Sequence, residues 1–204
     1  MKTIFENIIK NRYWQDSICG TGSTLRFTVP LRENLPGFLK KHNFTSMLDA
    51  PCGDYSWMSA VDLPADFKYV GADIVESLVL ANKKNYPAVE FDCIDITQDP
   101  LPEVDVLFCR DCLIHLSFQD IRKTFENVIN SNIKYVMLTN YHDADPTDIS
   151  TGNFRKTCFT AAPIDLGPPI DSIFDWIPGT VNGDQKRDMS LWHTQSIKQY
   201  LESL

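Results

Sequence analysis

The sequence predicts an α/β protein with a doubly wound, mostly parallel sheet, and three observations lead to this expectation. Short apolar runs alternate with segments of helical periodicity between residues 46 and 140. The chain has 204 residues, 43% of them hydrophobic, so one domain can bury a large core. No internal repeat or low-complexity tract interrupts the pattern. Such alternation is typical of βαβ units with right-handed crossovers.

The first two thirds of the chain supply the expected elements in order. The apolar run at 104–111 is continuous, as expected for a strand that is covered on both faces. The pattern at 118–132 predicts an amphipathic helix, because Ile121, Phe125 and Val128 share one face. In full, the sequence predicts strands at 46–50, 68–74, 89–96, 104–111 and 135–140, and helices at 37–43, 56–63, 76–86 and 118–132.

The alternation ends after Asn140. Residues 141–172 are rich in Asp, Pro, Thr and Gly and show no helical periodicity. Irregular segments of this length are uncommon in compact domains and are usually functional where they occur. The runs at 173–178 and 189–197 predict a terminal antiparallel pair of strands, and 197–204 predicts a short helix or a frayed tail.

Bulk properties restrict the partners and the location. The net charge is −8 and no Lys/Arg cluster stands out, so neither nucleic acid nor a membrane is expected as the main partner. Residues 1–14 lack a signal-peptide core, and no apolar run reaches the roughly 20 residues that span a bilayer. We therefore expect a cytoplasmic protein. Cys109 and Cys112 form the only CxxC pair, which we interpret as buried cysteines, and we expect no metal site.

Acidic side chains recur where the first four predicted strands end. These residues are Asp49, Asp73, Asp95 and Asp111, and the carboxyl ends of parallel strands meet at one edge of a sheet. A ribose diol requires a carboxylate that accepts two hydrogen bonds, which suits Asp73 at the end of the second strand. An adenine amino group requires an acceptor, which suits Asp95. Gly53 lets the backbone approach a ligand closely.

The turn after the first strand also excludes classes of ligand. It lacks the G-x-G-x-x-G and G-x-x-x-x-G-K-[ST] patterns, whose glycine amides bind phosphate groups. Asp54 follows the single glycine, and its negative charge would repel phosphate. S-adenosylmethionine has no phosphate, but it carries a sulfonium and an amino group, which an acidic pocket favours.

Several motifs in order along the chain resemble one enzyme family. They are SMLDAPCGDYSWM (46–58), YVGADIV (69–75), CRDCLIHLSF (109–118) and TGNFR (151–155). Together they resemble class I S-adenosylmethionine-dependent methyltransferases, and more narrowly a compact, largely bacterial branch with LDxPCGDFNWM and CRDCLxHLSF motifs. The resemblance covers nearly the whole chain. Pro51 and Tyr55 stand where the wider class favours glycine, and Phe154 replaces the branch's tryptophan, which leaves an aromatic wall.

The resemblance implies a Rossmann-like, seven-stranded sheet whose last strand is antiparallel. It implies a single methyltransferase domain over 1–204, with 1–40 as an N-terminal lid or helix and 141–185 as an acceptor-side insertion. S-adenosyl-L-methionine would be the cofactor and S-adenosyl-L-homocysteine the product. The implied cofactor contacts are Asp49, Pro51, Gly53, Asp73, Ile74, Asp95, Ile96, Cys109 and Arg110.

Methyl transfer requires alignment of donor and acceptor, and a hydroxyl acceptor also requires a base. Asp111 and His115 are the candidates, because a helical turn after the fourth strand would put them on one face. Either His115 is the base and Asp111 orients it, or Asp111 acts directly. His142, Phe154 and Arg155 are candidate acceptor contacts, with Arg155 suited to an anionic group.

The leading hypothesis is methyl transfer to a small-molecule or carbohydrate hydroxyl, and the resemblance points to surface-glycan biosynthesis. Two alternatives stay open: methylation of a small amine, and a non-catalytic module that only binds S-adenosylmethionine. The missing glycine triplet disfavours a nicotinamide oxidoreductase. The sequence leaves both a monomer and a homodimer open.

Overall fold

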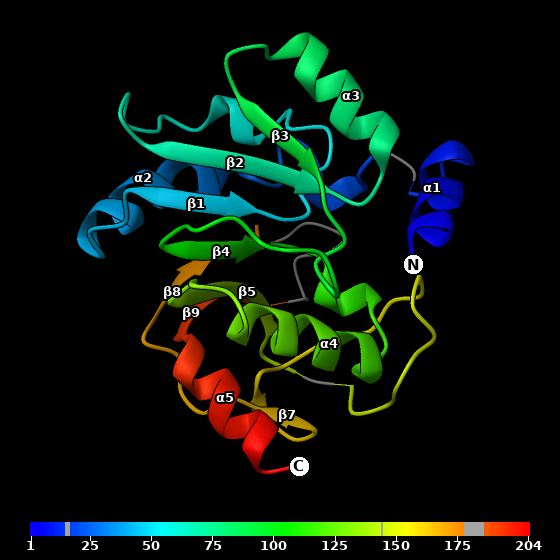
Figure 1. Ribbon diagram of the computed structural model, residues 1–204, viewed down its shortest axis with the longest axis vertical. Helices are drawn as coiled ribbons and strands as arrows, with labels where there is room; N and C mark the ends of the chain where they lie inside the picture. The colour runs from blue at the N-terminus through cyan, green and yellow to red at the C-terminus, as the bar shows by residue number, and fades with distance from the viewer. Residues whose placement is uncertain (15–16, 144, 178–185) are drawn as a thin grey trace.

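Seven strands form one sheet in the order β3-β2-β1-β4-β5-β9-β8 in the computed structural model, which describes residues 1–14, 17–143, 145–177 and 186–204 (Figure 1). The strands are β1 (Ser46–Asp49), β2 (Lys68–Asp73), β3 (Glu90–Cys93), β4 (Val106–Cys109), β5 (Tyr135–Tyr141), β8 (Asp171–Phe174) and β9 (Arg187–His193). The helices are α1 (Lys2–Lys10), α2 (Val29–Lys41), α3 (Glu76–Asn85), α4 (Phe118–Ile129) and α5 (Thr194–Glu202).

The strand directions confirm the predicted topology. β1 to β5 pair in parallel, whereas β9 runs antiparallel between β5 and β8. The last strand is therefore antiparallel, and the two late strands form the expected antiparallel pair. β1 lies between β2 and β4, so the strand order reverses beside it, and this is the point where open α/β sheets bind ligands.

Helices cover both faces of the sheet. α4 and α5 pack on one face, where Phe125 and Ile197 join a buried cluster that includes Leu48 and Leu107. α2 and α3 pack on the other, where Leu35 and Val79 meet Met47 and Phe108. Neighbouring residues of a strand thus enter opposite clusters, because side chains alternate across a pleated sheet. This two-sided burial explains the continuous apolar run of β4.

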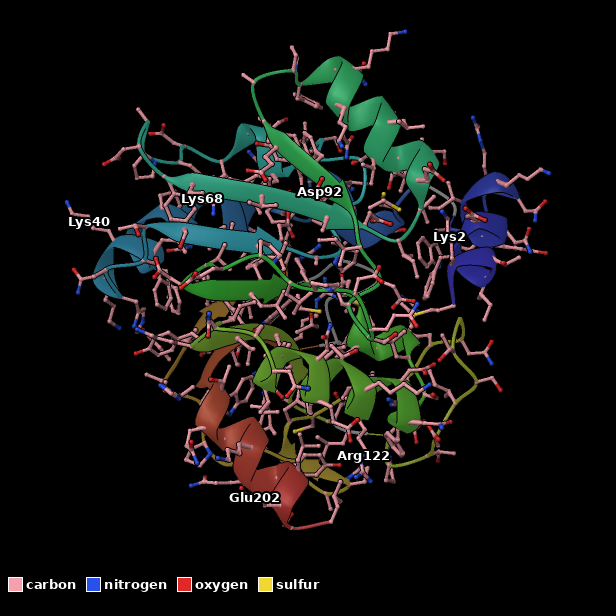
Figure 2. All side chains as sticks on the ribbon, in the orientation of Figure 1. Lys2, Lys40, Lys68, Asp92, Arg122 and Glu202 are labelled. Carbon is pink, nitrogen blue, oxygen red and sulfur yellow. The ribbon has the colours of Figure 1, made fainter. Side chains whose placement is uncertain are left out.

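Most charged side chains lie at the surface, outside this core. Figure 2 shows Lys2 and Lys40 projecting from opposite ends of the molecule. Arg122 and Glu126 form a surface ion pair one helical turn apart on α4. None of the helices in the described part of the chain is both long and apolar enough to span a membrane.

The structure corrects several predicted element bounds. The helix expected at 37–43 begins at Val29, because Leu31 and Leu35 extend its buried stripe and Pro30 suits a first turn. The helix expected at 56–63 is one 3-10 turn at Met58–Ala60. The strands expected at 89–96 and 104–111 are shorter, since their last residues leave the sheet and line a cavity.

The segment after β5 contains no helix in its described residues, as expected. It carries a small hairpin of β6 (Thr160–Ala161) and β7 (Ile164–Asp165). The predicted strand at 189–197 ends at His193, whose side chain accepts a hydrogen bond from the Gln195 amide and so begins α5. Residue 144 and residues 178–185 of the predicted 141–185 insertion lie outside the described residues.

Candidate active site

A cavity of about 310 Å³ lies at the carboxyl ends of β1, β2 and β4, within the size range of small-molecule sites. Figure 1 shows α1 beyond these strand ends. Met1 and Phe5 of α1 line the cavity, and so do Trp14 and the 3-10 turn at Thr21–Ser23. The N-terminal segment therefore covers the edge of the sheet where a ligand would bind.

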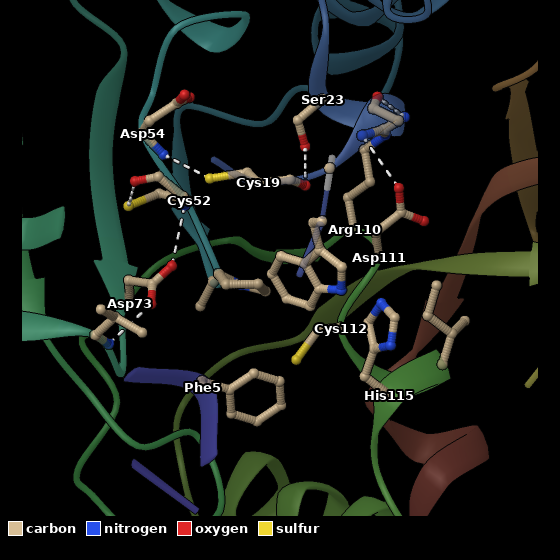
Figure 3. A pocket seen from close by; sticks show the side chains of 18 of the residues that line it. Phe5, Cys19, Ser23, Cys52, Asp54, Asp73, Arg110, Asp111, Cys112 and His115 are labelled. Atoms are coloured by element: carbon tan, nitrogen blue, oxygen red, sulfur yellow. Dashed lines mark hydrogen bonds and ion pairs between the residues drawn. The ribbon is translucent and has the colours of Figure 1, made fainter. Parts of the chain in front are cut away.

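Asp73 is a buried carboxylate at the end of β2 in the cavity wall, with 6% of its surface exposed. Its oxygens accept hydrogen bonds from the Gly53 amide at 3.1 Å and the Val75 amide at 2.9 Å (Figure 3). Burial raises the pKa of Asp73 to about 6, although these amides lower it. The carboxylate is thus held in place before any ligand arrives.

The turn after β1 packs against the N-terminal segment. Gly53 has a φ of 57°, and a Cβ there would lie 2.7 Å from the Cys19 sulfur. Only glycine tolerates both the conformation and the contact. The Asp54 amide donates a hydrogen bond to the Cys19 sulfur at 3.3 Å, as Figure 3 shows. The turn after β1 is therefore held in place by its contacts with Cys19 of the N-terminal segment.

The structure brings most of the predicted cofactor contacts to this cavity. Pro51, Gly53, Asp73, Ile74, Asp95, Ile96 and Arg110 all line it. Asp95 also accepts hydrogen bonds from the Thr97 amide and hydroxyl at 3.0 and 2.6 Å, through Oδ1.

Two predicted contacts lie outside the cavity lining. Asp49 is 2% exposed, and the Tyr69 hydroxyl donates a 2.6 Å hydrogen bond to its carboxylate within the core. Cys109 is 1% exposed at the end of β4, while its CxxC partner Cys112 lines the cavity. The resemblance implied a backbone contact for Cys109 and a place in the floor of the cofactor turn for Asp49. Asp49 pairs with Gly71, two residues before Asp73, and therefore lies deeper in the sheet than the cavity. All six cysteines are free.

Asp49 gives a testable pH dependence of stability. Burial raises its pKa from the ordinary 3.8 to about 7, despite the Tyr69 hydrogen bond. Between pH 4 and 7 the folded state therefore binds more protons than the unfolded state, so Asp49 lowers the free energy of unfolding as pH rises. We expect Asp49→Asn to flatten this fall in urea denaturation curves recorded from pH 4 to 8. An unchanged slope would show that the carboxylate is ionised throughout.

Four charged side chains, two of them buried and two partly buried, form a closed network in the cavity wall. The network joins Arg110, which follows β4, to Arg187 of β9, Asp111 and Asp175. Arg110 donates to both oxygens of Asp175 at 2.9 and 3.0 Å and lies 3.3 Å from Asp111. Arg187 donates to Asp111 at 2.7 Å and lies 3.3 Å from Asp175. Two positive and two negative charges therefore balance within one wall of the cavity.

The two candidate bases have different surroundings. Burial alone would raise the pKa of Asp111, but Arg187 and Arg110 hold it below the ordinary value. The two arginines thus favour the ionised form of Asp111. His115 does not contact Asp111 by a hydrogen bond; its Nδ1 lies 2.8 Å from the Asn153 carbonyl oxygen. Because a carbonyl only accepts, Nδ1 carries the proton and Nε2 presents a lone pair. The group in hydrogen-bond contact with the His115 ring is therefore the Asn153 carbonyl and not the Asp111 carboxylate.

His115 stands among aromatic rings in the cavity wall. Its ring centroid is 5.3 Å from that of Trp14 and 5.9 Å from that of Phe154. Burial holds the pKa of His115 below the ordinary value, so the ring is neutral near pH 7. Figure 3 shows it on the same side of the pocket as Cys112, opposite Asp73.

The three predicted acceptor contacts have different outcomes. Phe154 lines the cavity, at the position where an aromatic wall was expected. His142 lies outside it and contacts Asp188 at 2.7 Å. Arg155 also lies outside; it is 2% exposed, 3.3 Å from Asp148 and 4.2 Å from the centre of the Phe118 ring. Arg155 therefore contacts the loop and α4 rather than the cavity in which an anionic acceptor was expected to bind.

Sequence reasoning missed much of the far wall. Tyr141, Asp175, Trp176 and Arg187 all line the cavity. A signal for them existed: Asp175 follows β8, and Arg187 begins the antiparallel strand β9, so both stand at the same sheet edge as Asp73. Trp14 lies in the N-terminal segment, where no regular spacing marks it. Among the described residues, no group of three or more His, Cys, Asp or Glu side chains is placed to hold a metal ion.

Comparison with known proteins identifies the fold. No protein-family model matches the sequence, and no curated protein matches it either. Magnesium protoporphyrin IX methyltransferase from Synechocystis PCC 6803, solved with bound S-adenosylhomocysteine, shares 13% identity and a TM-score of 0.62, over 94% of this chain and 98% of that chain.

Two other solved structures agree with this result. The 1,6-didemethyltoxoflavin-N1-methyltransferase from Burkholderia thailandensis shares 14% identity and a TM-score of 0.60, over 94% of this chain and 86% of that chain. Human N-acetylserotonin methyltransferase shares 12% identity and a TM-score of 0.59, over 94% of this chain and 56% of that chain. The chain therefore has the Rossmann-like fold of class I methyltransferases.

Proposed function

We propose that this protein is an S-adenosylmethionine-dependent methyltransferase that acts on a hydroxyl group of a small molecule or carbohydrate. The observation that carries the proposal is the buried Asp73 carboxylate, held at the cavity by the Gly53 and Val75 amides at the end of β2. A carboxylate in that position suits a ribose diol. The structural neighbours solved with S-adenosylmethionine or S-adenosylhomocysteine support the same cofactor.

The residues around Asp73 fit the rest of this cofactor. Asp95 and Ile96 at the end of β3 would contact the adenine, and Ile74 and Pro51 would pack beside it. The Gly53 backbone would lie against the ligand without a Cβ in the way. Asp54 and Asp73 give this side of the cavity a negative potential, which suits a sulfonium and an amino group and opposes phosphate.

His115 is the residue that would make oxygen chemistry possible. The bound cofactor supplies a methyl carbon whose bond to sulfur breaks as the acceptor oxygen bonds to it. Nε2 of His115 would take the hydroxyl proton, since Nδ1 is already committed to the Asn153 carbonyl. The lowered pKa of His115 keeps Nε2 unprotonated at neutral pH. Asp111, fixed between two arginines, would keep the wall rigid rather than accept a proton.

Two segments of the chain would cover the cofactor and the acceptor separately. Residues 1–40 would act as a lid over the cofactor, because Met1, Phe5 and Cys19 line the cavity from outside the sheet. The 141–185 segment would shape the acceptor side through Phe154 and Trp176. We place the enzyme in the cytoplasm, as a monomer or homodimer, with surface-glycan biosynthesis as its setting.

Calorimetric titration with S-adenosylhomocysteine tests the cofactor directly. We expect micromolar binding, and Asp73→Ala should weaken it by 1.5–3 kcal/mol, roughly 10- to 150-fold, because charged hydrogen bonds to the ribose are lost. Asp92→Ala is the matched control: Asp92 (labelled in Figure 2) lies on β3 but pairs with Lys83 at the surface, 3.7 Å away. Its affinity should equal that of the wild type.

Other results would redirect the proposal. If folded wild-type protein does not bind S-adenosylhomocysteine, or binds NAD more tightly, the methyltransferase proposal fails. If it binds the cofactor but turns over no acceptor, the chain is a binding module rather than an enzyme.

A further inference from the structure

The acceptor side of the cavity has two cations, and neighbouring carboxylates neutralise both. Asp175 has no exposed side-chain surface and contacts both Arg110 and Arg187, while Asp111 contacts the same two arginines from the other side. The guanidinium groups are 3% and 13% exposed. An anionic ligand would therefore have to compete with two carboxylates that are already in contact.

The remaining charges of the cavity lie on the other side. Asp54, Asp73 and Asp95 follow β1, β2 and β3, and none of them forms an ion pair within the described part of the chain. The undescribed residues 15–16, 144 and 178–185 contain no Lys, Arg or His in the sequence. Thus the cofactor side is negative, and the wall formed by β4, β5 and β9 has no net charge.

Three polar atoms on the acceptor side have spare hydrogen-bonding capacity. The Tyr141 oxygen accepts from Arg187 at 3.1 Å, so its own proton is available to a ligand. Nε2 of His115 is an available acceptor, as described above. The Trp176 indole nitrogen is buried and has no hydrogen-bond partner among the described residues. All three residues line the cavity, which therefore offers two donors and one acceptor.

Aromatic rings connect these polar atoms. The centroid of the Phe154 ring lies 5.9 Å from that of the His115 ring and 6.3 Å from that of the Tyr141 ring. The Trp176 ring packs on Phe174, 4.5 Å away. Flat apolar faces beside hydroxyl-binding atoms suit a ring compound that carries oxygens at its edge.

We propose that the acceptor is an uncharged ring compound with at least two oxygen substituents, and that it carries no phosphate, carboxylate or amine. The inference rests on the proposed methyltransferase function and narrows its acceptor class. One oxygen would give its proton to His115 and receive the methyl group. A second oxygen would accept a hydrogen bond from Tyr141 or Trp176. A nucleotide sugar would leave its phosphates unpaired beside Asp111 and Asp175.

Matched triplets of probes test the charge preference. Protein saturated with S-adenosylhomocysteine is titrated with methyl glucoside, methyl galactoside, methyl mannoside and catechol, each beside its phosphorylated and its amino-substituted analogue. We expect at least one neutral member to bind, and to bind about tenfold or more tightly than both charged analogues. Tyr141→Phe should weaken that neutral probe while leaving S-adenosylhomocysteine affinity unchanged.

Each other outcome is decisive. If a phosphorylated or amino member binds best, the acceptor is charged and the inference is wrong. If no neutral probe binds while S-adenosylhomocysteine does, the ring-compound class is wrong and the proposed function stands. If S-adenosylhomocysteine itself does not bind, the proposed function has failed first.

One substitution tests whether charge balance is the cause. Asp111→Asn keeps the shape of the side chain but leaves one positive charge uncompensated in the network. In this variant we expect the ratio of affinities between the neutral and the phosphorylated probe to fall by about tenfold. Thermal unfolding checks that the variant is folded. An unchanged gap would show that shape alone excludes phosphate. If the variant does not fold, the comparison of neutral and charged probes on the wild-type protein still tests the inference.

Discussion

Asp175→Ala is expected to lower the free energy of unfolding by about 3–5 kcal/mol, the typical cost of breaking a buried ion pair. The Asp175 carboxylate accepts two hydrogen bonds from Arg110 and lies 3.3 Å from Arg187, with no exposed side-chain surface. Without it, the buried guanidinium group of Arg110 and the partly buried one of Arg187 share the single carboxylate of Asp111. Urea denaturation at pH 7, followed by tryptophan fluorescence, measures the loss.

A surface ion pair provides the matched control for this experiment. Asp143 contacts Lys156 at 2.7 Å, and its side chain is 64% exposed. Because water solvates both partners, Asp143→Ala should cost about 1 kcal/mol or less. Equal losses in the two variants would show that the network near the cavity contributes no more than a surface pair, and that the arginines find other partners.

His115→Phe is expected to reduce kcat by about 10²–10⁴-fold, the usual contribution of a general base. Phenylalanine keeps the ring between Trp14 and Phe154 but removes the Nε2 lone pair. The affinity for S-adenosylhomocysteine should not change, because His115 lies on the acceptor side. Rates of S-adenosylhomocysteine release with the best neutral probe, together with calorimetry, separate the two effects.

The pH profile gives this prediction a second measurement. Burial holds the pKa of His115 below 6.5. The midpoint of the fall in wild-type kcat should therefore lie below pH 6.5, where the ring gains a proton. His142→Ala is the control, because His142 is 47% exposed and contacts Asp188 outside the cavity. If His115→Phe retains full kcat, no base is needed, as for an amine acceptor.

The parallel half of the fold was predictable because its signals are local. A buried strand is a short apolar run, and an acid at its end marks the edge of the sheet; Asp73 and Asp95 were found in this way. Asp49 shows the limit of that reasoning. It ends its strand as Asp73 does, yet it contacts Tyr69 in the core, because it pairs with Gly71, two residues before Asp73, and so lies deeper in the sheet on the same face.

The charge network was not predictable for a different reason. Arg110 and Asp175 are 65 residues apart, and Asp111 and Arg187 are 76 apart. No spacing rule connects such pairs, and their partnership depends on the insertion of β9 between β5 and β8. Likewise, Arg155 looked like a free cation in the sequence, whereas the fold places it against Phe118 and Asp148.

The contact between Cys19 and the turn after β1 makes this thiol a natural reporter of lid opening. Its sulfur accepts a hydrogen bond from the Asp54 amide, and burial raises its pKa, so little of the reactive thiolate is expected while the N-terminal segment is in place. Alkylation at Cys19 therefore records how often that segment leaves the cavity. Cys93 is exposed on β3 and supplies an internal standard in the same molecule. The protein can thus reveal the exchange of its ligand without an attached label.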